Sequence, residues 1–487
     1  MRKIRGTTYV GKAHSGSSLP YVGRGPFRNW TRPPQWRLDA GGLSPDAKSS
    51  MGSRLIATFV LLAFLCPADM VIKVVGASGH AAGLFGLTLL AFWVVSSLLG
   101  FHDPLHTRHP TRAVVGLMIV SSLLSYAAMP FYNPTEVQSL SALRWMLQWL
   151  CIAGIVVVTA EFIRAKRDLI RVVRVLVWGA AVSGVVAAVQ FATGWDPAGL
   201  LRSVMLGFSL NAEIVLDTRG TLTRAIGTAG HPIELGVIAG MILPLAFWLL
   251  IYDEERSRLS RLLAIAGVGL AIPVSVTRSA VLATAIGLGV LVVLLPARHR
   301  MWILGFAPLA AVAVFISTPG YLRTISSFII AGSTDPSVMN RTNNYPIVER
   351  LVTEAPWLGR GGGTYIQRDL TKVLDNEYLM AAIELGLIGL VCMVLYFLVP
   401  VLTALNARRM EDWTMRSLCA ALAGGTLAAA VCGLTFDSLS FAQFACVHAV
   451  FVGLCGSCWL YSTADQPADD GAVALVGETA KPAAFPG

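Results

Sequence analysis

The residues Asp375-Asn376-Glu377 stand directly before a long apolar run, in the stretch TKVLDNEYLMAAIELGLIGL. A carboxylate there can take a proton from a hydroxyl group, and burial among apolar side chains would raise its pKa toward a useful range. The same carboxylate can cap a helix, with Asp375 as the N-cap and Glu377 in the positive first turn. The sequence therefore leaves two interpretations of Asp375, a catalytic base or a cap.

Two arginines occur where an apolar sequence would otherwise exclude charge. Arg224 precedes a glycine-rich turn and His231-Pro232, where a helix with free backbone N–H groups should begin. Arg278 lies between two apolar runs with almost no loop, where an unpaired charge costs at least about 2.5 kcal/mol. Guanidinium groups hold phosphate oxygens in bidentate fashion, so converging arginines indicate a diphosphate or polyanionic substrate. The structural alternatives are that Arg224 reaches lipid phosphate while His231 caps the helix, and that Arg278 forms an internal salt bridge.

A long polar stretch, NRTNNYPIVERLVTEAPWLGRGGGTYIQRDLTKVLDNEYL, precedes the late apolar run. Its apolar residues recur at helical spacing between 345 and 354, which predicts an amphipathic helix lying over the bundle. The run Gly361-Gly362-Gly363 would let backbone approach a ligand closely, or it forms a flexible turn. Further arginines in the outer segments add positive charge to the same surface, namely Arg219, Arg341, Arg360 and Arg368.

The elements that must position these residues are membrane spans. Of the 487 residues, 55% are hydrophobic and only 14% are charged, and the mean hydropathy is +0.65. Apolar runs of about twenty residues, the length that a membrane span requires, recur along the chain. We predict an all-α polytopic membrane protein with about 12 transmembrane helices. They lie near 55–75, 79–100, 113–131, 142–162, 172–193, 233–252, 262–277, 279–297, 301–318, 378–404, 417–436 and 441–461.

The basic residues predict the orientation, because Lys and Arg accumulate on the cytoplasmic side of a membrane. Most of the 38 basic residues fall in the amino-terminal tail and in alternate short loops, while the other short loops carry only Lys73, Arg144 and Arg278. We therefore expect both termini in the cytoplasm. Two long outer segments, 194–232 and 319–377, then hold the candidate residues, and long loops between packed elements usually have a function.

The chain divides by composition into three parts. Residues 1–54 predict a disordered basic cytoplasmic tail, 55–462 a transmembrane domain, and 463–487 a second disordered cytoplasmic tail. All eight cysteines lie within or at the edges of apolar runs, which argues against a disulfide framework. His102, His106 and His109 are spaced almost like metal ligands, but prolines interrupt the helix that would align them, so we predict no metal site.

Four stretches resemble the signature segments of the O-antigen ligase and O-antigen polymerase family. They are RAIGTAGHPIELG, VTRSAVLATAIGLGVL, NRTNNYPIVERLVTEAPWLGRGGGTY and DNEYLMAAIELGLIGL, and they cover roughly 219–395 in the family's order. The resemblance implies an integral-membrane glycosyltransferase with a fold of the GT-C type, which uses neither a metal nor another cofactor. Such enzymes transfer or polymerise a polyprenyl-diphosphate-linked glycan at the outer face of the bacterial plasma membrane, in surface polysaccharide biosynthesis.

The resemblance also implies roles for single residues. Arg224 and Arg278 match the arginines that hold the donor diphosphate, and Arg341 matches the loop arginine of the family. The family has a histidine just before the asparagine that opens the late helix, where this chain has Asp375. Asp375 is therefore the first candidate base, and His231, the only histidine in either long outer segment, is the second.

Four further residues complete the predicted binding site for diphosphate and glycan. They are Arg219, Arg360, Asn376 and Glu384. For Glu384, packing against an arginine is the structural alternative, because a carboxylate within a membrane helix needs a partner.

The partners that the resemblance implies are a polyprenyl-diphosphate-linked oligosaccharide as donor, a glycan or lipid as acceptor, membrane lipids, and a polysaccharide export machinery. No nucleic acid is expected. Two other functions stay open. A transporter of anions or lipid-linked sugars would also place arginines near membrane depth. A non-catalytic scaffold of a polysaccharide export complex would explain the missing histidine. The sequence does not identify the sugar or the acceptor, and it does not separate a ligase from a polymerase.

Overall fold

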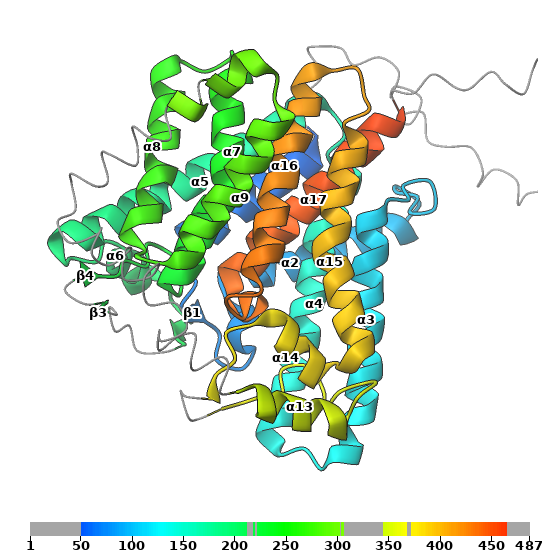
Figure 1. Cartoon of the computed structure of the whole chain (residues 1–487). Coiled ribbons are helices and arrows are strands. Elements are labelled where there is room, and N and C mark those ends of the chain that lie inside the picture. The colour runs from blue at the N-terminus through cyan, green and yellow to red at the C-terminus, as the bar shows by residue number, and fades with distance from the viewer. Residues whose placement is uncertain are drawn as a thin grey trace, which may run out of the picture. The chain divides into compact units, whose positions relative to one another are not determined.

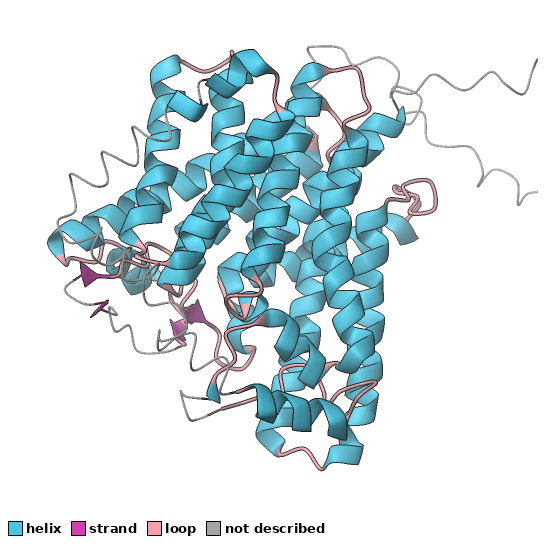
Figure 2. Cartoon of the chain, viewed as in Figure 1, coloured by secondary structure: helices cyan, strands magenta, loops and turns pink. Residues whose placement is uncertain are grey.

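The computed structural model describes residues 50–211, 218–219, 222–301, 303–305, 344–367 and 372–464. The chain divides into two units, Met1–Ala47 and Lys48–Gly487, and every described residue belongs to the second. Most of these residues are helical, with a few short strands (Figure 2). The predicted tails 1–54 and 463–487 lie for the most part outside the described residues.

The helices follow one another along the chain. They are α1 (Met51–Leu65), α2 (Ala81–Leu98), α3 (Pro110–Ala128), α4 (Glu136–Phe162), α5 (Lys166–Thr193), α6 (Ala198–Val204), α7 (Pro232–Tyr252), α8 (Arg258–Val274), α9 (Arg278–Leu294), α13 (Tyr345–Glu354), α14 (Glu377–Glu384), α15 (Gly386–Ala407), α16 (Trp413–Cys432) and α17 (Ala442–Ala464). Among the described residues, eight helices are long and apolar enough to cross a membrane: α2, α3, α4, α5, α7, α15, α16 and α17. This agrees with the predicted polytopic all-α membrane protein.

The predicted spans correspond to helices except for 301–318, which lies mainly outside the described residues, so the number twelve stays a prediction. Two boundaries differ. The first helix ends at Leu65 rather than near 75, because Pro67 follows and Met70–Val71 forms strand β1. The predicted span 378–404 is two helices, since Gly386 has a φ of +68° and separates α14 from the apolar α15.

The helices of the second unit form one bundle with a shared apolar core. Figure 1 shows α16 and α17 running between a group that contains α7, α8 and α9 and a group that contains α3, α4 and α15. Trp149, Trp248 and Tyr396 are among its largest fully buried side chains. Small residues allow close helix approach: a Cβ at Gly184 of α5 would lie 2.1 Å from the carbonyl oxygen of Gly267 in α8.

Short strands and ion pairs fasten the first outer segment to the bundle. Strand β1 pairs antiparallel with β2 (Ser209–Leu210), with Met70 opposite Leu210. Strand β3 (Thr218–Arg219) pairs with β4 (Leu222–Thr223). The guanidinium of Arg202 in α6 donates to Asp69 at 3.0 Å and also binds Asp196. The segment is therefore attached on both sides of α6.

Two of the three histidines with near-metal spacing, His102 and His109, are bound to a glutamate at the end of α4. Glu161 is buried and accepts hydrogen bonds from Trp93 Nε1 at 2.8 Å and Arg112 Nη1 at 3.0 Å, and it also binds His102 and His109. Within the described part of the chain, no group of three His, Cys, Asp or Glu side chains could hold a metal ion. All eight cysteines are free thiols.

Candidate functional site

Three helices begin close together at one end of the bundle, and each is capped by a side chain from the sequence motifs. His231 Nδ1 accepts from the backbone N–H of Ile233 at 3.2 Å at the start of α7. Thr277 Oγ1 accepts from Ala280 N at 3.3 Å at the start of α9. At the start of α14, Asn376 Oδ1 accepts from the backbone N–H groups of Tyr378 and Leu379 at 3.0 and 3.1 Å. Helix N-termini carry partial positive charge and favour anions nearby.

These caps decide two of the open interpretations. The prediction that His231 caps its helix is confirmed. The prediction that Asp375 is the N-cap of the late helix is wrong, because Asn376 occupies that position and makes both capping bonds. Asp375 is half-buried one residue earlier. The N-cap of α14 is therefore the amide of Asn376.

The turn between α8 and α9, which we call the arginine turn (275–278), brings Arg224 and Arg278 together. Arg278 is the first residue of α9. Arg224 is buried, and its Nε lies 3.4 Å from the carbonyl oxygen of Ser275, while the N–H of Ala225 donates to Val274 O at 3.1 Å. Residues far apart in sequence are thus attached to one turn.

The backbone of the arginine turn is strained. Val276 has a φ of +46°, a region that β-branched residues rarely adopt. Such strain persists only where the surrounding structure enforces it, and it is frequent at functional sites. The surroundings here are tight: a Cβ at Gly236 of α7 would lie 2.5 Å from Ser275 Oγ and 2.9 Å from Thr277 Oγ1. The packing of α7 therefore fixes the turn and its arginine.

A loop between α16 and α17, residues 433–441, contacts all three helix starts, and we call it the hub loop. Thr435 Oγ1 lies 2.8 Å from Ser279 Oγ of α9. The backbone N–H of Glu377 donates to Gly433 O at 2.8 Å, and Asn376 Nδ2 donates to Leu434 O at 3.3 Å. The ring of Phe441 lies 5.3 Å from that of His231. The hub loop therefore joins the arginine turn to the Asp375 segment.

Buried carboxylates line the contact between the hub loop and α14. Glu377 Oε2 accepts from Leu439 N at 2.8 Å and from Ser438 Oγ at 3.4 Å. Burial raises the pKa of Glu377 to about 8, and the charge of Asp437 adds to the increase. Burial also raises the pKa of Asp437 to about 7, with a further contribution from the charge of Asp375. The pKa values of two carboxyl groups of the hub region are therefore raised to neutral pH or above.

The glycine-rich segment, residues 359–365, belongs to a different region, which we call the glycine loop. It packs on α4 and α14: a Cβ at Gly362 would lie 2.2 Å from the ring of Trp145. Glu384 accepts from Gly363 N at 2.7 Å and from Tyr365 N at 3.0 Å, and its own carbonyl accepts from Gly361 N at 2.9 Å. These glycines allow close contact within the protein rather than with a ligand, and Glu384 holds backbone N–H groups rather than an arginine.

Of the remaining predicted site residues, Arg360 is the one whose side chain is described, and it does not join the arginine turn. Arg360 forms an ion pair with Glu354 of α13, and its guanidinium lies 5.8 Å from the ring centre of Tyr132. Arg219 is in β3, where its backbone pairs with Leu222, and its side chain is outside the description. Arg341 lies outside the described residues. The predicted helix over 345–354 is confirmed as α13, which packs on α14 through Val348.

Sequence reasoning missed the hub loop and Asp437. The only signal was a short polar break, TFDSLS, between the last two spans, which resembles an ordinary turn. It also missed Glu234, whose carboxylate accepts from Gly230 N at 2.7 Å and from Phe444 N at 2.9 Å and so ties α7 to α17.

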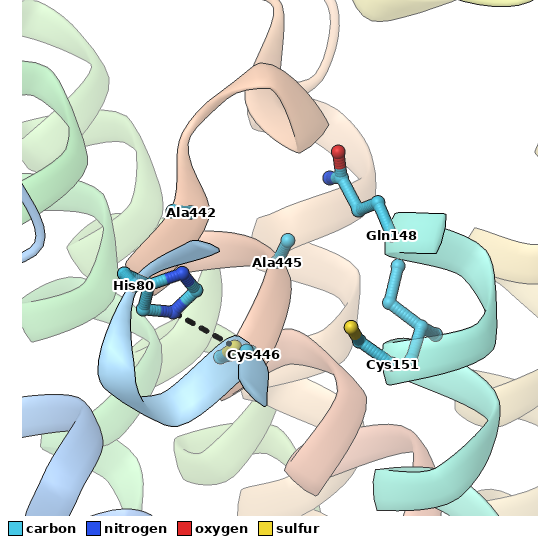
Figure 3. A pocket seen from close by; sticks show the side chains of 8 residues that line it. His80, Gln148, Cys151, Ala442, Ala445 and Cys446 are labelled. Atoms are coloured by element: carbon cyan, nitrogen blue, oxygen red, sulfur yellow. Dashed lines mark hydrogen bonds between the residues drawn. The ribbon is translucent and has the colours of Figure 1, made fainter. Parts of the chain in front are cut away.

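A small pocket adjoins the hub loop on the side of α2 and α4 (Figure 3). His80 Nε2 lies 3.4 Å from Cys446 Sγ there, and Gln148 donates to the carbonyl of Leu439. Its lining is mainly apolar and includes neither Arg224 nor Arg278. We therefore place the candidate site at the arginine turn and the hub loop.

One family model matches part of the chain. Residues 262–394 match the family model described as O-antigen ligase. No curated protein matches the chain. The matched segment contains α8, the arginine turn, α9, α13, α14 and the first part of α15, while Arg224 and His231 precede it and the hub loop follows it. Across this segment, the predicted resemblance to the O-antigen ligase and O-antigen polymerase family is confirmed.

Proposed function

We propose that this protein is a membrane glycosyltransferase that transfers or polymerises a polyprenyl-diphosphate-linked glycan at the outer face of the plasma membrane, in surface polysaccharide biosynthesis. One observation carries the proposal. Arg224 and Arg278 meet at a strained turn, within an O-antigen-ligase-like segment, beside the N-termini of α7 and α14. Two guanidinium groups with helix N-termini are well suited to a diphosphate.

The donor diphosphate would bind at the arginine turn. As the bond from the anomeric carbon to the diphosphate oxygen breaks, its electron pair stays on the diphosphate, and Arg224 and Arg278 stabilise the added charge. His231 suits the same role. Its Nδ1 accepts the N–H of Ile233, so the neutral ring carries its proton on Nε2 and acts there as a donor. This assignment favours anion binding over general-base work for His231.

The acceptor would be activated at Asp375. Its carboxylate takes the proton of the acceptor hydroxyl while that oxygen bonds to the anomeric carbon. Asp375 directly precedes the N-cap Asn376, and it lies near Asp437, whose pKa is raised to about 7 by burial first and by the charge of Asp375 second. A carboxyl group with a raised pKa beside a second carboxyl group is a common arrangement for proton transfer near neutral pH.

The test is a transfer assay on the purified full-length protein with a polyprenyl-diphosphate oligosaccharide and a glycan acceptor. We expect longer glycan together with released polyprenyl diphosphate. Arg278→Ala and Arg224→Ala should each lower the rate by about 10²–10³-fold, as the loss of a charge-stabilising donor does. Arg360→Ala is the matched control, because Arg360 is held by Glu354 in the other region. Wild-type protein that moves the lipid without releasing diphosphate would support a transporter instead.

A further inference from the structure

Three arginines gather at the opposite end of the bundle, around the end of α9. Arg300 donates from Nε to Leu295 O at 2.7 Å and from Nη2 to Val293 O at 2.9 Å. Arg408, at the end of α15, donates from Nη2 to Leu294 O at 2.9 Å. Three consecutive carbonyls at the negative end of α9 therefore hold two guanidinium groups side by side.

The third arginine stands close to the second. The guanidinium of Arg416 in α16 lies 4.4 Å from the ring centre of Trp413, an arrangement typical of a cation–π contact. Burial lowers the pKa of Arg408, and the positive charge of Arg416 lowers it further. The Nε groups of Arg408 and Arg416 are both buried without a hydrogen-bond partner among the described residues. The positively charged guanidinium groups of Arg408 and Arg416 are thus held close to each other.

No described carboxylate forms a salt bridge with Arg300, Arg408 or Arg416. Basic residues in the neighbouring loops differ in this respect. Arg174 binds Asp253 at 2.7 Å, and Arg112 binds Glu161 at 3.0 Å. The nearest acidic residue in the α15–α16 turn, Asp412, binds Lys166 at 2.7 Å and caps α16. The charge of the three arginines is therefore not matched by a carboxylate of the described residues.

The surface beside the arginines is apolar and suits a lipid tail. Leu398, Leu402 and Leu405 follow one another at helical spacing on α15, with exposed fractions of 41%, 56% and 37%. Arg408 follows the stripe directly after the end of α15. Trp413 is 61% exposed beside Arg416, and tryptophan is enriched at the level of lipid head groups. A free phosphate ion would use the arginines but not the leucine stripe.

We propose that Arg300, Arg408 and Arg416 form a binding site for the head group of an anionic phospholipid, whose acyl chain lies on Leu398, Leu402 and Leu405. Basic pockets between membrane helices are known to hold such head groups. The lipid phosphate supplies the missing counter-charge and joins the ends of α9, α15 and α16. This site is separate from the proposed catalytic site and does not depend on it.

Native mass spectrometry of the purified full-length protein tests this site, with phosphatidylglycerol, phosphatidylcholine and inorganic phosphate as probes. Wild-type protein should retain phosphatidylglycerol in preference to phosphatidylcholine, and inorganic phosphate should compete poorly. Arg416→Gln should weaken phosphatidylglycerol binding by about fivefold, the value expected for one basic residue at a membrane surface. Arg256→Gln is the matched control, because Arg256 is an exposed basic residue in the loop between α7 and α8, outside the proposed site.

Three results would contradict the proposal: equal retention of the two lipids by wild type, unchanged binding by Arg416→Gln, or displacement of lipid by inorganic phosphate at similar concentration, which would indicate a simple anion site. Thermal unfolding without lipid shows whether Arg416→Gln is folded. Should it be destabilised, Arg416→Lys keeps the charge and is expected to keep the preference for phosphatidylglycerol. Loss of that preference in Arg416→Lys also contradicts the site.

Discussion

The arginine turn and the glycine loop carry similar kinds of residues but are built in opposite ways. At the arginine turn, Val276 has a strained backbone, and Arg224 and Arg278 are brought to one place. In the glycine loop, the backbone N–H groups are bound by Glu384, and Arg360 is paired with Glu354. The ion pair of Arg360 stabilises the fold, whereas a strained backbone such as that of Val276 is frequent at functional sites.

The largest expected effect concerns Asp375, in the segment that the hub loop joins to the arginine turn. Asp375→Ala should lower glycan transfer by about 10²–10⁴-fold, the usual contribution of a general base. Asp375→His should keep transfer equal or higher, because histidine is the residue that the family resemblance places there. Glu354→Ala is the matched control, as its carboxylate belongs to α13 beside the glycine loop. Transfer by Asp375→Ala at the wild-type rate would remove Asp375 from the mechanism.

The second prediction places one methyl group in each region. In Gly236→Ala, the new Cβ would meet Ser275 Oγ at 2.5 Å and displace the arginine turn, so transfer should fall by about 10²-fold, as small displacements of binding groups do. In Gly362→Ala, the Cβ meets Trp145, so we expect a loss of about 1–3 kcal/mol in stability. Thermal unfolding and transfer per folded molecule separate the two effects. The comparison fails if both variants lose activity and stability alike.

The third prediction concerns pH. The pKa of Glu377 rises from 4.5 to about 8 on folding, mainly through burial. A carboxyl group with a raised folded-state pKa stabilises the fold below its unfolded pKa, and this contribution is lost as the pH rises toward about 8. Glu377→Gln keeps an oxygen to accept from Leu439 N and has no charge, so its melting temperature should depend less on pH between about 5 and 8. If the melting temperatures of wild type and Glu377→Gln change with pH in the same way over this range, Glu377 is not a neutral buried carboxyl group in the folded protein.

The smallest effect is expected for Arg360→Ala. Its guanidinium is partly exposed and paired with an exposed glutamate, so removing it should cost no more than about 1 kcal/mol of stability. Transfer should be nearly unchanged. A large loss of transfer with unchanged melting temperature would move Arg360 into the substrate site and weaken the distinction between the two regions.

The elements with strong periodic patterns could be predicted from the sequence. The apolar runs predicted the helices of the bundle, and the spacing of Val348 and its neighbours predicted α13. The division of α14 from α15 could not be predicted, because it depends on one glycine with a positive φ inside a continuous apolar run. A pattern of hydropathy does not report such backbone angles.

The candidate site was only partly predictable. The motifs indicated Arg224, Arg278 and Asp375, but not that Asn376 rather than Asp375 caps α14. Their meeting depends on the hub loop, which begins more than fifty residues after Asp375 and contains no distinctive motif. The role of Glu384 was not predictable either, since its partners are backbone N–H groups, which carry no signal in the pattern of side chains.

The central claim, that the arginine turn holds a diphosphate and the glycine loop does not, is tested most directly by binding of a polyprenyl diphosphate without any acceptor. Hydrogen bonds to charged groups contribute about 1.5–3 kcal/mol, so Arg224→Ala and Arg278→Ala should each raise the dissociation constant by about 10- to 150-fold. Arg360→Ala should bind as wild type does. Equal weakening in all three variants, or wild-type affinity in Arg224→Ala and Arg278→Ala, would contradict the claim.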